Sequence, residues 1–205
     1  MKHLLSIFKN KITPDALVLE TTYLFETNRV NDEVEALIEQ IKELTNLNLQ
    51  DSFNEIRNSW LYAKSSMLFS ILINKGMRES DAKIFQIGII KYIEKEYPID
   101  FNYSYTSKLI DQYYTDKTSI DKKDLESNLR NNSFFAYTIC FSSSSIGYTK
   151  LFTVLLGDIV KNKSDQEKFT QEIDQHIVLL EKTITYHMTI YWQDLIEISE
   201  KYKLY

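Results

Sequence analysis

Apolar residues recur every three or four positions along most of this chain, which is the spacing of one face of an α-helix. The clearest case is residues 31–44, where apolar and acidic side chains separate onto opposite faces. The acidic face carries Asp32, Glu35, Glu39 and Glu43. Because the apolar face must be buried, this segment predicts a helix that packs against other helices. The apolar face comprises Val34, Leu37, Ile38, Ile41 and Leu44.

The same spacing predicts other helices. A short one begins at the Thr13-Pro14 pair, a plausible N-cap and first helical residue, and ends near Asn28. A largely buried helix is expected over 51–75, stopping at Gly76, and another from Ser80 to the residue before Pro98. The last and longest helix, 165–201, would extend about 55 Å at ~1.5 Å per residue. It either forms the spine of a bundle or projects towards a partner.

Composition favours the same fold class. The chain has only 4 Gly and 2 Pro, too few for the many tight turns of a β-sandwich or barrel, or for a glycine-rich phosphate loop. Two shorter helices are expected over 104–115 and 121–130. Segment 134–141 has the aromatic content of a strand, but we interpret it as a helix because no partner strand is evident. We predict one all-α domain over 1–205, a bundle of seven to nine helices with a long C-terminal helix.

Charge, hydropathy and the single cysteine limit the possible partners and the cellular compartment. The formal net charge is −5 and four residues are Arg, which disfavours nucleic-acid binding. No run of about 18 apolar residues predicts a membrane span, and the apolar N-terminal run is too short for a secretory signal. Cys140 is the single cysteine, so no internal disulfide forms, and its apolar neighbours favour a packing role. We therefore expect a cytoplasmic protein.

No motif in the sequence predicts a metal, a cofactor or a catalytic residue. The three histidines are His3, His176 and His187. His176 and His187 are about 16 Å apart along one helix, too far to share an ion. His187 is most simply a core or interface histidine. It nevertheless lines up with Tyr191 and Asp194 at i, i+4 and i+7, so these three could form the polar group of a site between helices.

Two features suit contact with another protein. The acidic face of 31–44 is most simply solvated, but its charge would also complement a basic surface. The second feature is an irregular segment, 97–123, that is rich in tyrosine and aspartate. Tyrosine side chains offer a large contact area with few rotatable bonds. The candidate contact residues of this segment are Tyr103, Tyr105, Asp111, Tyr113 and Tyr114.

Two functional hypotheses follow. In the first, the chain is a non-enzymatic acidic helical protein that binds another protein with a basic surface, such as a toxin-neutralising immunity protein or an inhibitor. In the second, it is an enzyme or small-ligand binder with a site around His187. A deep polar pocket at His187 or a bound metal would favour the second hypothesis, and a fully packed His187 with one hydrogen bond would favour the first. The long C-terminal helix leaves open a homodimer in either case.

Overall fold

The computed structural model describes residues 12–45, 49–74, 76–99, 151–157 and 166–201. Within these ranges the chain forms six α-helices and no strand, which confirms the all-α prediction. The count is lower than the seven to nine helices expected for the whole chain. Helix boundaries largely follow the pattern of apolar residues.

The first helices are separated by a break that the sequence did not predict. Helix α2, Pro14–Thr21, begins as expected, with the Thr13 hydroxyl accepting a hydrogen bond from the amide of Ala16 at 3.3 Å. It stops before Asn28, because Thr22–Phe25 forms a 3₁₀ turn, η2. Extended backbone at Glu26 then redirects the chain into α3. The expected end of the first helix near Asn28 was therefore wrong.

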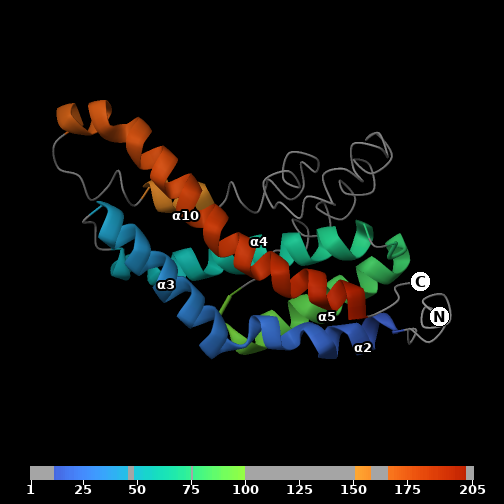
Figure 1. Cartoon of the computed structure of the whole chain (residues 1–205). Coiled ribbons are helices and arrows are strands. Elements are labelled where there is room, and N and C mark those ends of the chain that lie inside the picture. The colour runs from blue at the N-terminus through green and yellow to red at the C-terminus, as the bar shows by residue number, and fades with distance from the viewer. Residues whose placement is uncertain (1–11, 46–48, 75, 100–150, 158–165, 202–205) are drawn as a thin grey trace, which may run out of the picture.

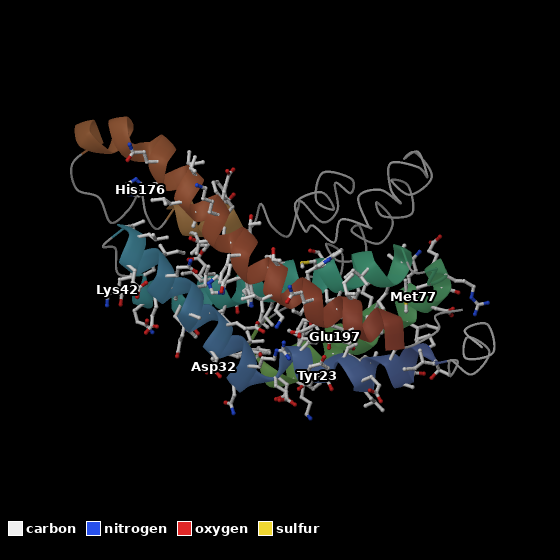
Figure 2. All side chains as sticks on the ribbon, viewed as in Figure 1. Tyr23, Asp32, Lys42, Met77, His176 and Glu197 are labelled. Atoms are coloured by element: carbon white, nitrogen blue, oxygen red, sulfur yellow. The ribbon has the colours of Figure 1, made fainter. Side chains whose placement is uncertain are left out.

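Helix α3, Thr27–Thr45, begins earlier than predicted and buries the predicted apolar face. Leu44 is the exception and is exposed, as expected where a helix end leaves its neighbours. In Figure 2, the labelled Asp32 and Lys42 lie on the outer side of this helix, and both are exposed. Its buried residues are Val30, Val34, Leu37, Ile38 and Ile41.

Helix α4, Phe53–Asn74, is the centre of the core and follows the short 3₁₀ turn η3, Gln50–Ser52. It contacts α3, α5 and α10, so apolar residues surround most of its circumference. It ends before Gly76, whose φ of 104° is the left-handed conformation that favours glycine. The expectation of a largely buried helix is confirmed, since its recurring apolar residues are buried apart from the half-buried Phe53: Ile56, Trp60, Leu61, Met67, Leu68, Ile71 and Leu72.

Helix α5, Glu79–Glu96, ends before Pro98 as predicted and packs against α2. Of the isoleucines that recur along α5, Ile90 and Ile93 are buried, whereas Ile84 and Ile87 are exposed. Helix α5 lies close to α2 at Gly88, where a Cβ atom would lie 2.6 Å from Cγ2 of Val18. Glycine therefore permits this helix packing.

The long helix α10, Gln166–Lys201, crosses α4 and lies beside α3 (Figure 1), and it contacts both helices. It has 36 residues, close to the predicted 165–201. Residues 151–157 form a further short helix, in which Leu151 and Leu155 are buried. The buried face of α10 includes Leu180, Ile184, Leu195 and Ile198, as the spacing predicts, and also Met188 and Trp192.

Three predicted segments lie outside the described residues: the helices 104–115 and 121–130, and the segment 134–141, which we interpret as a helix. Of the helices in the described ranges, none combines the length and the apolar character needed to cross a bilayer.

Candidate functional site

A lysine lies in the middle of the apolar core. Lys64, on α4, has no exposed side-chain surface. Its ammonium group donates hydrogen bonds of 2.6 Å to the backbone carbonyl of Leu24 and 2.6 Å to Oε2 of Glu33. The same nitrogen lies 4.5 Å from the ring centroid of Tyr191 and 5.7 Å from that of Phe25. A carboxylate, a carbonyl and two aromatic rings thus replace the water that a buried ammonium loses.

The break between α2 and α3 supplies part of this environment. The backbone carbonyl of Leu24, in η2, points towards the Lys64 ammonium instead of solvent. The next carbonyl, that of Phe25, accepts a hydrogen bond of 2.8 Å from the hydroxyl of Tyr97, which follows α5. Two buried polar side chains therefore satisfy backbone groups exposed by the break, which would otherwise be costly to bury.

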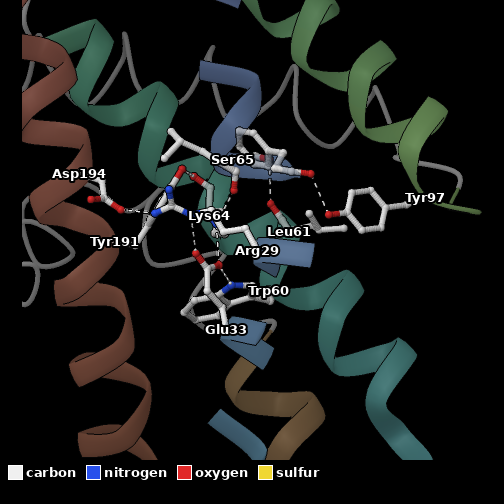
Figure 3. Close-up of polar contacts among 11 residues, drawn as sticks. Arg29, Glu33, Trp60, Leu61, Lys64, Ser65, Tyr97, Tyr191 and Asp194 are labelled. Carbon is white, nitrogen blue, oxygen red and sulfur yellow. Dashed lines mark hydrogen bonds and ion pairs between the residues drawn. The ribbon is translucent and has the colours of Figure 1, made fainter. Parts of the chain in front are cut away.

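Glu33 connects Lys64 to the surface (Figure 3). Its Oε2 accepts hydrogen bonds from Lys64 and, at 2.8 Å, from the indole nitrogen of Trp60. Its Oε1 accepts one of 3.1 Å from Nε of Arg29, one turn earlier on α3. The other end of the Arg29 guanidinium forms an ion pair with Asp194 on α10. Four charged side chains therefore alternate in sign from the core to the α3–α10 boundary.

Burial changes the acid–base properties of the inner groups. Loss of hydration lowers the pKa of Lys64 to about 8, and the attraction of Glu33 offsets only part of that effect. Burial likewise raises the pKa of the Tyr191 phenol well above 10. Tyr191 therefore stays neutral at physiological pH, and its hydroxyl donates a hydrogen bond of 3.2 Å to the backbone carbonyl of Lys64.

A pocket of about 430 Å³ opens beside this chain of charges, between α3, α4 and α10. This volume lies in the range of small-molecule sites, about 300–1,000 Å³. Carboxylates, one guanidinium, aromatic rings and two aliphatic side chains line it together. The lining residues are Arg29, Asp32, Glu33, Ala36, Trp60, Tyr186, His187, Ile190, Tyr191 and Asp194.

His187 stands on one wall of the pocket. Its Nε2 lies 2.9 Å from Oε1 of Gln40 on α3, so the two groups share a hydrogen bond. Its ring meets that of Trp60 edge-on, with centroids 6.5 Å apart. Burial lowers the pKa of His187 below its ordinary value. The imidazole is therefore neutral at neutral pH.

The structure brings together the polar group predicted on the C-terminal helix, but within the described ranges only one of the predicted protein-contact residues lies beside it. His187, Tyr191 and Asp194 all line the pocket, as their spacing on one helix face suggested. Of the acidic residues, Asp32 is at the pocket, whereas Glu35, Glu39 and Glu43 are exposed on α3 and do not line it. The remaining predicted contact residues, Tyr103, Tyr105, Asp111, Tyr113 and Tyr114, lie outside the described residues.

Sequence reasoning missed the other polar residues of the site: Arg29, Glu33, Trp60 and Lys64. Lys64 did leave a signal, since it lies four residues after Trp60 on the apolar stripe of α4. A charged residue in such a position requires a buried partner. The identity of that partner, Glu33, depends on how α3 packs against α4 and has no counterpart in the sequence.

Within the described ranges, no group of three or more His, Cys, Asp or Glu side chains is placed to hold a metal ion. No protein-family model, curated protein or solved structure matches the chain.

Proposed function

We propose that the protein binds a ligand in the pocket between α3, α4 and α10. One observation carries the proposal: His187, Tyr191 and Asp194 share a cavity of about 430 Å³ with Arg29 and Glu33. Ligand sites commonly combine an apolar lining with a few convergent polar groups. This cavity has both, which favours a site around His187.

The surroundings of the pocket support recognition by a fixed site. Glu33 is held by three donors from two helices, and Arg29 is held at both ends of its guanidinium group. Side chains held in this way lose little further freedom when a ligand binds, so less of the binding energy is lost to ordering. We propose binding and not catalysis, because both oxygens of Glu33 already accept hydrogen bonds and Lys64 is sealed from the pocket side by Glu33 and Tyr191.

The test is a pocket-filling substitution. Ala36 lines the pocket but is exposed, so Ala36→Trp fills space without removing a polar contact. Leu19→Trp on α2, at a side chain that is 75% exposed, is the matched control for adding an indole. Both variants and the wild type would be screened by thermal unfolding against a panel of amines, carboxylates, phosphates and nucleosides. Compounds that bind the folded state raise the Tm.

We expect at least one class of compound to raise the Tm of the wild type and of Leu19→Trp but not of Ala36→Trp. A panel without effect on the wild type would contradict the proposal. So would stabilisation that Ala36→Trp leaves unchanged, because binding would then occur elsewhere.

A second candidate function is binding of a protein with a basic surface, for instance a toxin neutralised by this chain in the cytoplasm. The observation that favours it is the exposure of Glu35, Glu39 and Glu43 on the outer face of α3. Reversal of all three to Lys should weaken capture of such a partner from the native cell and remove the salt dependence of that capture. Capture that is unchanged by the reversal would exclude the acidic face.

A further inference from the structure

We infer that the pocket takes an organic cation: a primary ammonium or guanidinium group carried on a short apolar stem. This inference rests on the proposed function and adds the chemical class of the ligand. It depends on three features of the pocket: its balance of charge, its aromatic walls and the way in which its one cation is already occupied.

The charges at the pocket do not balance. Lys64 is paired with Glu33, and Arg29 is paired with Asp194. Asp32 also lines the pocket, and among the described residues its carboxylate has neither an ion pair nor a hydrogen bond. The two cations and three carboxylates named here leave a net charge of −1. This excess of negative charge favours a positive ligand.

The walls are suited to the same charge. Four aromatic residues line the pocket: Tyr186 is 58% exposed, His187 is half-buried, and Trp60 and Tyr191 are at most 2% exposed. The Tyr186 ring is therefore the one most open to a ligand, and aromatic faces attract ammonium and guanidinium groups. This chain already uses that attraction twice nearby: Lys64 lies over Tyr191, and the Arg29 guanidinium carbon lies 5.2 Å from the ring centroid of Tyr23. The neutral imidazole of His187 adds no repulsion at neutral pH.

An anionic ligand fits less well. Among the residues that the structure describes, Arg29 is the one cation that lines the pocket, and its Nε and Nη2 groups already donate to Glu33 and Asp194. The guanidinium charge is already balanced by Glu33 and Asp194, so an entering carboxylate or phosphate would be repelled by these carboxylates and by Asp32. A cation is attracted by the same carboxylates, and Ala36 and Ile190 supply aliphatic surface for its stem.

Such a cation could be a free amine or the basic side chain of a protein partner. Calorimetric titration tests the free form with pentylamine, which carries one ammonium group on an apolar stem, and with the dications agmatine and cadaverine; glutarate and pentanol are anionic and neutral controls of similar length. A peptide of about ten residues with one arginine, and the same peptide with glutamine in its place, test the side chain. Tighter binding of the arginine peptide than of agmatine would indicate a protein partner, and the reverse a free amine.

The decisive variant is Asp32→Asn, with Glu55→Gln on an exposed position of α4 as the matched control. Loss of one carboxylate near an organic cation should weaken agmatine binding roughly five-fold, and added salt should weaken it further. Glu55→Gln should bind as the wild type does.

The results separate the two proposals. Binding of glutarate or pentanol but not of any cation, abolished by Ala36→Trp, would overturn the cation assignment and keep the pocket as a ligand site. Cation binding that survives Ala36→Trp would overturn both proposals. An unchanged affinity for agmatine in Asp32→Asn would also overturn the cation inference.

Discussion

Tyr191 and Lys64 contact each other in two ways. The Tyr191 hydroxyl donates a hydrogen bond of 3.2 Å to the backbone carbonyl of Lys64, and the Lys64 ammonium lies 4.5 Å from the centroid of the Tyr191 ring. The pair joins the long helix α10 to the central helix α4 directly behind the pocket. The two contacts can be separated by substitution.

Removal of the hydroxyl alone should cost less than removal of the ring. Tyr191→Phe keeps the aromatic face over Lys64 and loses one hydrogen bond, so we expect a loss of about 1 kcal/mol in the free energy of unfolding. Tyr191→Leu loses the hydrogen bond, the ring and packing volume, and should cost about 3 kcal/mol. Urea unfolding of the three proteins measures both values. Equal losses for the two variants would show that the ring contributes nothing to the burial of Lys64.

Lys64 should be the most sensitive charged residue of the chain. Lys64→Met leaves the Leu24 carbonyl without this donor and Glu33 without its buried counter-charge, at an expected cost of about 2–4 kcal/mol. The control is Lys83→Met, which removes an exposed i,i+4 pair with Glu79 and should change stability by less than about 0.5 kcal/mol. A similar effect of the two substitutions in urea unfolding would contradict this account of the core.

The stability of the folded chain should depend on pH through the same residue. Because burial lowers the pKa of Lys64 from 10.5 to about 8, the unfolded chain still holds this proton at pH values where the folded chain has released it. The contribution of Lys64 to the free energy of unfolding therefore rises with pH between about 8 and 10.5 and is lowest below pH 8.

This pH dependence is measured by comparison with Lys64→Met from about pH 7.5 to 9.5, below the range in which tyrosines ionise. The wild type should show the steeper rise, by at most about 1.4 kcal/mol per pH unit. Parallel curves for the two proteins would mean that the Lys64 pKa is not lowered on folding.

The sequence predicts the helices better than it predicts the pocket, for a physical reason. The apolar stripes of α3, α4 and α10 follow from the repeat of the helix itself, so a local pattern suffices. The break at Thr22–Phe25 was missed because no glycine or proline marks it, and it is stabilised by tertiary contacts from Lys64 and Tyr97.

The residues of the site likewise fall into those that a local pattern predicts and those that it does not. His187, Tyr191 and Asp194 could be grouped in advance because one helix presents them on one face. Arg29 and Glu33 join them only through the packing of α3 against α4 and α10. Long-range pairs such as Arg29 with Asp194, which are 165 residues apart, leave no local signal in the sequence.

Gly88 offers a test of how closely α2 and α5 pack. Alanine favours a helix over glycine by about 1 kcal/mol, so at an open position Gly88→Ala would stabilise the protein. Here the new Cβ would lie 2.6 Å from Cγ2, 3.2 Å from Cγ1 and 3.4 Å from Cβ of Val18. The two methyl groups are the atoms in tight contact, and rotating them away is costly because valine strongly prefers one χ1 rotamer in a helix. We therefore expect Gly88→Ala to destabilise the protein by about 1–2 kcal/mol.

The double variant Gly88→Ala with Val18→Ala distinguishes this clash from other causes. Val18 is only partly buried, so Val18→Ala alone should cost less than about 1 kcal/mol. In the Val18→Ala background the new Cβ has room, and Gly88→Ala should become neutral or stabilising because the helix propensity of alanine then dominates. Urea unfolding of the four proteins gives the coupling energy. Additive effects of the two substitutions would show that α2 and α5 do not approach each other at Gly88.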